Sequence, residues 1–156
     1  MKILLVDDHE MVRLGLKSYL DLQADVDVVA ESADGRAGVE KALELRPDVI
    51  VMDIVMPEMN GIEATLAILK EWPEAQILIL TSYLDNEKIY PVLDAGAKGY
   101  MLKTSSADEI LQAIRKVAKG EIAIETEVSK KVQYHRNHIE LHEDLTARER
   151  DILGLL

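Results

Sequence analysis

Residues 49–64, VIVMDIVMPEMNGIEA, decide how this chain folds. A short, uniformly apolar run ends at Asp53, and a turn containing Pro and Gly then leads into a helical pattern. A run without polar positions has no face for water, so it predicts a strand inside a parallel sheet that helices cover on both sides. Ligands of such sheets bind beyond the carboxyl ends of the strands, which is where Asp53 is expected to lie.

Apolar runs and amphipathic stretches alternate over the first 120 residues. The runs predict strands at 3–6, 26–30, 49–52, 77–80 and 99–102, and the stretches between them predict helices at about 10–22, 35–45, 61–71, 86–95 and 106–119. Asp34, Asn60 and Ser106 stand where helix N-caps belong, and the last two precede a Glu by three residues, as in a capping box. Right-handed crossovers wind five such βα units into an open three-layer α/β sandwich.

Composition limits what the chain can be. Its 156 residues, 48% hydrophobic and 4% aromatic, suffice for one buried domain with an appendage. No apolar run is long enough to span a bilayer and no cysteine is present, so a soluble, cytoplasmic protein is expected. The net charge is -11, and residues 120–156 carry five basic against eight acidic side chains. Because DNA-binding surfaces are normally cationic, residues 1–156 are not expected to bind DNA themselves.

The pattern changes after Gly120. Apolar residues recur at helical spacing from Val128 to Ile139, a polar stretch follows, and LTARERDILGLL at 145–156 begins another amphipathic helix behind a capping box. The chain is expected to stop shortly after a second domain begins. The predicted divisions are a domain at 1–120, a linker with one amphipathic helix at 121–143, and the first helix of an all-α domain at 144–156.

Three acids follow predicted strands at one edge of the sheet: Asp7 and Asp8 follow the first strand and Asp53 follows the third. A carboxylate can attack phosphorus only when the surrounding negative charge is neutralised, and Mg²⁺, which prefers oxygen ligands, does this. Asp7 and Asp8 are suitable Mg²⁺ ligands, directly or through water, beside Asp53 as the nucleophile. The backbone carbonyl of Val55 is a candidate for a further ligand.

Two more polar residues follow strands at the same edge. Thr81, after the fourth strand, can donate a hydroxyl hydrogen bond to a phosphoryl oxygen, and Lys103, after the fifth, can neutralise another. Taken singly, each of these residues is more often a helix cap, a turn residue or a solvated side chain. Together they predict a Mg²⁺-dependent phosphoryl site.

Four motifs resemble those of two-component response regulators. LLVDDHEMVR at 4–13 holds the acidic pair, residues 49–64 hold the phosphoacceptor, ILILTS at 77–82 holds the switch hydroxyl, and GAKGYMLKTS at 96–105 holds the aromatic and the lysine. The resemblance covers about residues 1–120. It implies a flavodoxin-like (βα)5 doubly wound parallel sheet with strand order 2-1-3-4-5.

The resemblance also implies roles. Asp53 would accept a phosphoryl group from a sensor histidine kinase, Asp7 and Asp8 would hold Mg²⁺, Thr81 and Lys103 would contact the phosphoryl group, and Tyr100 would be the switch aromatic. Phosphorylation would then move Thr81, let Tyr100 turn inward and change the face of the fourth helix, fifth strand and fifth helix. A homodimer through that face or through the first helix is expected. Beyond self-phosphotransfer and autodephosphorylation, such a protein is not an enzyme.

The VDDHEMVR start, LKTSS in place of the common Lys-Pro, and the final LTARERDILGLL are similar to the NarL/FixJ family, and within it to cell-envelope-stress regulators of Gram-positive bacteria. Members end in a LuxR-type helix-turn-helix, so DNA would be bound through a C-terminal domain of which only the first helix is present. Thr104 puts the family's usual cis peptide after Lys103 in doubt. Val55 and Tyr83 occupy positions that in the family influence phosphoaspartate hydrolysis, and their size and apolarity predict slow hydrolysis.

Other interpretations fit parts of the pattern. A Mg²⁺-dependent phosphatase of the haloacid dehalogenase type needs an acid two residues after its nucleophile, where this chain has Val55. A flavodoxin-like cofactor binder needs a phosphate loop after the first strand, where this chain has two acids. His9 is interpreted as the first turn of a helix rather than a base. A zinc site is conceivable at three histidines spaced three and four apart, although such residues are more often solvated: His135, His138 and His142.

Overall fold

The computed structural model describes residues 1–82 and 86–124, and for residues 86–89 it describes the backbone alone. The predictions for Tyr83, for the three late histidines, for the linker helix and for the second domain at 144–156 lie outside these residues. By its internal contacts the chain divides into a unit Met1–Glu125 and a unit Thr126–Leu156. All the described residues belong to the first unit.

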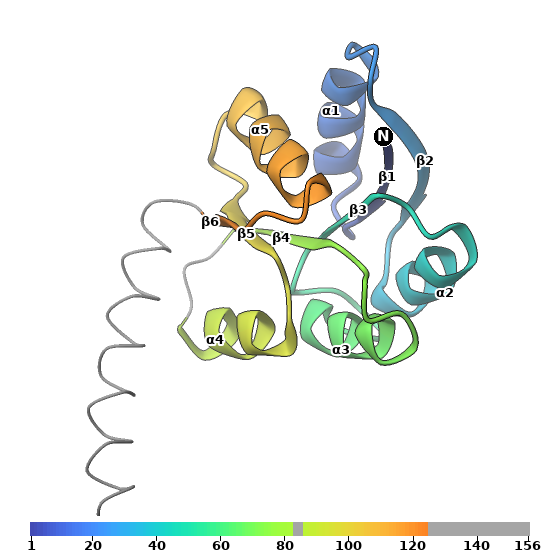
Figure 1. The fold of residues 1–156 in the computed structure, drawn as a ribbon, viewed down its shortest axis with the longest axis vertical. Coiled ribbons are helices and arrows are strands. Elements are labelled where there is room, and N and C mark those ends of the chain that lie inside the picture. The colour runs from blue at the N-terminus through green and yellow to red at the C-terminus, as the bar shows by residue number, and fades with distance from the viewer. Residues whose placement is uncertain (83–85, 125–156) are drawn as a thin grey trace, which may run out of the picture. The chain divides into compact units, whose positions relative to one another are not determined.

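The first unit consists of five βα units followed by a short sixth strand (Figure 1). The strands are β1 (Lys2–Val6), β2 (Asp27–Ser32), β3 (Val49–Met52), β4 (Ile77–Thr81), β5 (Gly99–Leu102) and β6 (Ala123–Ile124). The helices are α1 (Glu10–Asp21), α2 (Gly35–Leu45), α3 (Gly61–Glu71), α4 (Asn86–Ala95) and α5 (Ala107–Ala118). Every strand pair is parallel and the sheet order is β2-β1-β3-β4-β5-β6, which confirms the flavodoxin-like order 2-1-3-4-5.

Helices cover both faces of the sheet, as the apolar runs predicted. Figure 1 shows α1 and α5 on one face and α2, α3 and α4 on the other. The central strands β3 and β4 are buried at every position, which leaves no wet face. On the α1 and α5 side, Leu20 and Ile114 are fully buried against the strands. Within the described residues, no helix is both long and apolar enough to cross a bilayer.

Helix N-termini form where the capping residues predicted them. The side chain of Asp34 accepts a hydrogen bond from the Ala37 N–H at the start of α2. Asn60 and Glu63 form a complete capping box at the start of α3. Ser106 caps α5 by accepting from the Glu109 N–H. Each cap satisfies a backbone donor that the first helical turn leaves open, and so fixes where the chain leaves the functional edge of the sheet.

Strand ends differ from the prediction by one or two residues, so Thr81 is the last residue of β4 rather than the residue after it. The largest differences are in β2 and β6. Strand β2 runs to Ser32 rather than ending at residue 30, and its last carbonyl accepts a hydrogen bond from the Asp7 N–H. Strand β6 was not predicted, because two residues carry no periodicity; its pairing with Gly99 and Tyr100 of β5 is a tertiary contact. Both additions lengthen the sheet without changing its topology.

Candidate functional site

Two adjacent strands bring the predicted acids together. Strands β1 and β3 pair in parallel with Val6 opposite Met52, so the next residues, Asp7 and Asp53, leave the sheet side by side. The Asp53 N–H donates to the Val6 carbonyl at 2.9 Å, which continues the ladder one residue beyond β3. Asp7 and Asp53 are buried, whereas the Asp8 side chain is 34% exposed. Asp8 therefore stands at the solvent side of the cluster.

The turn after Asp53 is held by the start of α3. The Gly61 N–H donates to the Ile54 carbonyl at 2.7 Å, which folds residues 54–61 back over the strand end. A Cβ on Gly61 would lie 2.1 Å from the Asp53 carbonyl oxygen, so only glycine fits this approach. The Ile54 N–H donates to Asp53 Oδ1 at 2.8 Å and fixes the rotation of the carboxylate.

Lys103 joins the two buried acids from the end of β5. Its Nζ lies 2.7 Å from Asp7 Oδ2 and 3.1 Å from Asp53 Oδ2, and its side chain is only 10% exposed. The Lys103 N–H donates to the Thr81 carbonyl at 2.8 Å, so the ends of β4 and β5 are tied together. No peptide bond in the described residues is cis, and the bond from Lys103 to Thr104 is therefore trans.

The other predicted residues lie at the same edge or on the strands that lead to it. Thr81 is the last residue of β4 and is 1% exposed. Tyr100, on β5, is fully buried. Val55, two residues past Asp53, is 47% exposed, so its side chain faces solvent above the cluster. The structure thus brings the acids and the lysine into contact and places the hydroxyl at the adjacent strand end.

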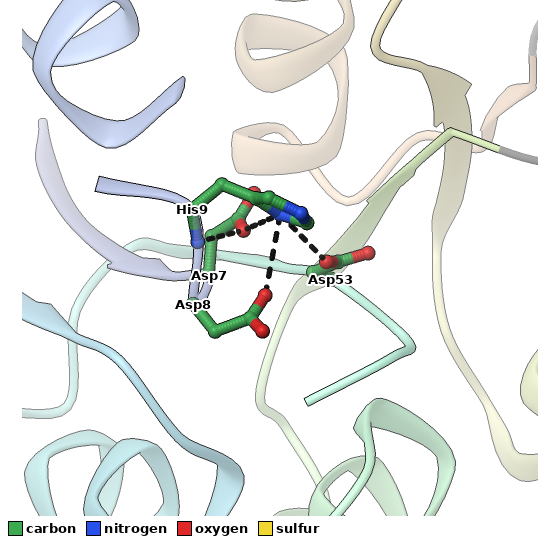
Figure 2. A group of neighbouring side chains, drawn as sticks. All are labelled: Asp7, Asp8, His9 and Asp53. Carbon is green, nitrogen blue, oxygen red and sulfur yellow. Dashed lines mark hydrogen bonds and ion pairs between the residues drawn. The ribbon is translucent and has the colours of Figure 1, made fainter. Parts of the chain in front are cut away.

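Sequence reasoning underestimated His9. It is the N-cap of α1 rather than part of its first turn, and its ring is turned toward the three acids (Figure 2). His9 Nδ1 lies 2.9 Å from Asp7 Oδ1 and 3.2 Å from Asp8 Oδ1. In the sequence, only its place beside the acidic pair pointed to a role at the site. Its N-cap position gave no such signal, because N-cap positions normally carry Ser, Thr, Asp or Asn.

Arg13 is a second residue that the sequence did not single out. Its guanidinium donates to the Asp7 carbonyl, and its Nε lies 3.4 Å from Glu31 Oε1. Arg13 thereby connects α1, the end of β1 and strand β2. Its bond to the Asp7 carbonyl holds the backbone of the acidic pair.

Burial is the main influence on the protonation of Asp53. It raises the pKa of the Asp53 carboxyl above its ordinary value of 3.8; Lys103 opposes this shift and Asp7 adds to it. Burial in a medium less polar than water disfavours the charged form. Because burial disfavours the ionised form of Asp53, a cation that binds beside this carboxylate stabilises it.

We predict that the raised pKa of Asp53 makes the free energy of unfolding depend on pH. A carboxyl whose folded-state pKa is raised stabilises the fold below its unfolded pKa, and that stability is lost as the pH rises through the folded value. The substitution Asp53→Asn removes this titration. In EDTA, the urea midpoint of Asp53→Asn should therefore exceed that of the wild type by a margin that widens from the ordinary carboxyl range toward neutral pH. A margin that stays constant or narrows would contradict the raised pKa.

The donor set fits a divalent cation. Carboxylate oxygens from Asp7, Asp8 and Asp53 and a ring nitrogen from His9 all lie within 4.8 Å of one another. Carboxylate oxygens at a partly exposed edge are what Mg²⁺ uses in proteins, with water completing its shell. Lys103 Nζ already contacts two of these oxygens. The cluster can therefore hold positive charge either as this ammonium or as a metal ion.

Because Lys103 competes for the same oxygens, we predict that Lys103→Met tightens Mg²⁺ binding by about fivefold, or about 1 kcal/mol. Titration calorimetry with MgCl₂ measures this directly. The matched control is Lys98→Met, which removes the same charge just before β5, at the opposite edge of the sheet. If both variants changed the affinity equally, only the net charge would matter and the competition would be excluded.

Comparison with known proteins places this site in a family. Residues 3–115 match the response regulator receiver domain. Over the whole chain, 49% of positions are identical to the transcriptional regulatory protein LiaR of Bacillus subtilis and 47% to the response regulator VraR of Staphylococcus aureus, of which the chain spans 76% and 75%. A LuxR-family two-component response regulator from Aurantimonas superposes with a TM-score of 0.81 at 35% identity, over 86% of this chain and 96% of that one. The acidic group Asp7, Asp8 and Asp53 is typical of the phosphoacceptor site of receivers. The chain belongs to the LuxR-family response regulators of two-component systems, is related to LiaR and VraR, and contains a receiver domain over residues 3–115.

Proposed function

We propose that Asp53 accepts a phosphoryl group from a sensor histidine kinase in a Mg²⁺-dependent reaction. One observation carries this proposal: a buried carboxylate, a second buried acid and a nearly buried ammonium converge at the ends of three parallel strands, with Lys103 Nζ in contact with both Asp7 and Asp53. Each of these groups has a distinct use in moving a phosphoryl group. A purely structural ion pair would need neither the second acid nor the exposed Asp8.

The contacts around Asp53 support the proposed roles of the acceptor and its neighbours. The Ile54 N–H and Lys103 hold the Asp53 carboxylate in one orientation, through Oδ1 and Oδ2 respectively. A carboxylate oxygen attacks the phosphorus of the donor while the bond to the donor's leaving group breaks. Lys103 then neutralises part of the charge that the phosphoryl group brings.

Asp7, Asp8 and the carbonyl of Val55 are the proposed ligands of the magnesium ion, beside Asp53 itself. When bound, Mg²⁺ supplies the positive charge that lets the acids and the phosphoryl oxygens share one site. The protein's part is to fix the ligand directions. The hydrogen bond from the Asp7 N–H to Ser32 and the one from Arg13 to the Asp7 carbonyl hold the first ligand in place.

The readout is proposed to be a switch followed by dimerisation. The added charge attracts the Thr81 hydroxyl, and Tyr100 occupies a buried position on the neighbouring strand β5. Of the two faces considered for a homodimer, α1 and its C-cap residue carry large apolar side chains that are exposed in the described unit: Met11, Leu14 and Leu22. A dimer would bring two C-terminal helix-turn-helix domains to DNA, beyond residues 1–156. On this proposal the protein acts in the cytoplasm as a transcription regulator.

The test is uptake of a phosphoryl group from phosphoramidate with Mg²⁺, followed by intact mass and size-exclusion chromatography. We expect one phosphoryl group per chain, no uptake in EDTA, and a shift toward dimer. An aspartyl phosphatase would instead release phosphate continuously. Uptake that does not depend on Mg²⁺, or turnover without a stable mass gain, would contradict the proposal.

Val55 provides a further prediction on the phosphorylated state. Its exposed apolar side chain stands two residues past the acceptor, where it can hinder water from reaching the acyl phosphate. We expect Val55→Asn to shorten the acyl phosphate lifetime several-fold, by roughly 1 kcal/mol of activation free energy. Decay followed by mass spectrometry measures the lifetime, and Leu66→Asn, another exposed apolar position, is the control. A lifetime that neither Val55→Asn nor Tyr83→Ala changes would remove this role at both positions.

A further inference from the structure

His9 has a ring that its backbone position does not require. As the N-cap of α1 it has extended backbone angles, but its side chain makes no capping hydrogen bond. Ser, Thr, Asp or Asn would serve the helix better. The ring instead points into the acidic cluster, as Figure 2 shows. Polar contacts with Asp7 and Lys103 in the cluster, rather than helix capping, hold the ring in this orientation.

The ring nitrogen lies at ligand spacing from the acids. His9 Nδ1 is 2.9 Å from Asp7 Oδ1, 3.2 Å from Asp8 Oδ1 and 3.7 Å from Asp53 Oδ2. An octahedral ion with bonds of about 2.1 Å holds neighbouring donors about 3.0 Å apart. The distances from Nδ1 to the Asp7 and Asp8 oxygens match this spacing between neighbouring ligands. The ring is 56% exposed, so an ion can reach the nitrogen from solvent.

We propose that His9 makes this site a binding site for borderline first-row transition cations such as Co²⁺, in competition with Mg²⁺. The proposal rests on the phosphoryl site proposed above and adds a metal specificity to it. Carboxylates and water suit Mg²⁺, whereas an imidazole nitrogen favours the later first-row metals. With Asp7 and Asp8, His9 offers one nitrogen and two oxygens from consecutive residues.

Lys103 defines the simplest competing explanation. Its Nζ lies 3.1 Å from His9 Nδ1, and the same nitrogen is in hydrogen-bond contact with Asp7 Oδ1 at 2.9 Å, so the ring can be explained as one more hydrogen-bonding neighbour of the ammonium and the acids. In that case His9 would influence all divalent cations alike, through charge and orientation. A metal ligand acts differently, because its contribution depends on the identity of the ion. The discriminating quantity is therefore the ratio of Co²⁺ to Mg²⁺ affinity.

The experiment uses the full chain with His135, His138 and His142 all replaced by Gln, since these residues are the remaining histidines of the sequence. Calorimetry at mildly alkaline pH measures Co²⁺ and Mg²⁺ affinity in this background, with and without His9→Asn. Asparagine is a good N-cap, so this substitution preserves the start of α1. Asp8→Asn is the control for an oxygen ligand. Proton NMR of the Co²⁺ complex is recorded in parallel, because a coordinated imidazole gives a strongly shifted, exchangeable ring N–H signal.

We expect His9→Asn to lower the ratio of Co²⁺ to Mg²⁺ affinity by at least about tenfold and to abolish the shifted signal. Asp8→Asn should weaken both ions while the signal remains. A ratio that His9→Asn leaves unchanged, or a complex without the shifted signal, overturns the proposal. Neither result affects the phosphoryl site, which fails instead if the wild type takes up no phosphoryl group in Mg²⁺.

Discussion

Asp53→Asn is expected to abolish phosphoryl uptake, reducing the initial rate by more than about a thousandfold. The amide is a poor nucleophile, and it also lacks the charge that Lys103 contacts at 3.1 Å. The neighbouring acids do not replace it: Asp7 is paired with Lys103 at 2.7 Å, and Asp8 stands at the exposed side of the cluster. Intact mass after incubation with phosphoramidate and Mg²⁺ measures the loss.

The matched control for this prediction is Asp27→Asn. Asp27 is an exposed acid at the start of β2, on the edge of the sheet opposite the site. The Asp27→Asn substitution removes the same charge as Asp53→Asn, so phosphoryl uptake by this variant should equal that of the wild type. If Asp53→Asn gained mass at a comparable rate, the acceptor would be another residue and the roles assigned to the cluster would be wrong.

Gly61→Ala is expected to lower the free energy of unfolding by about 3 kcal/mol. The added Cβ would lie 2.1 Å from the Asp53 carbonyl oxygen and 2.8 Å from the Ile54 Cα, both of which are backbone atoms that cannot rotate away. Relief requires the turn from Ile54 to Gly61 to move, which breaks the 2.7 Å hydrogen bond between these two residues. The same movement displaces Asp53, so phosphoryl uptake should fall as well.

Gly15→Ala is the matched control for the substitution at Gly61. Gly15 lies inside α1, and a Cβ there would meet no atom within 4 Å. This change should stabilise the protein by about 0.5–1 kcal/mol, because alanine favours the helix over the unfolded chain. Urea unfolding followed by circular dichroism gives both values. A loss of less than about 0.5 kcal/mol for Gly61→Ala would show that the turn is not tightly packed on the acceptor.

Much of the fold could be predicted because local and tertiary signals agree. The runs at 49–52 and 77–80 are apolar throughout, and every residue of both is buried. The caps at Asp34 and Asn60 mark the same helix starts in sequence and structure. Strand β6 could not be predicted, since its two residues become a strand only by pairing with Gly99 and Tyr100.

The candidate site was predictable in its members but not in its contacts. Residues that follow predicted strands are expected at the edge formed by the carboxyl ends of the strands, and Asp7, Asp53 and Lys103 do meet there. The sequence could not tell that Lys103 bridges both acids, because side-chain directions depend on the packed ends of β4 and β5. The orientation of the His9 ring was not predicted for a similar reason: whether an N-cap side chain turns toward its helix or toward a neighbouring strand is decided by the fold.

Asp53 is proposed to be the one residue that carries a phosphoryl group, through a site that needs Mg²⁺. Borohydride reduction after incubation with phosphoramidate converts an acyl phosphate at an aspartate into homoserine, and peptide mapping locates it. We predict conversion at residue 53 alone, and only when Mg²⁺ is present. Conversion at Asp7, Asp8 or any other aspartate, or conversion at residue 53 in EDTA, would contradict the account.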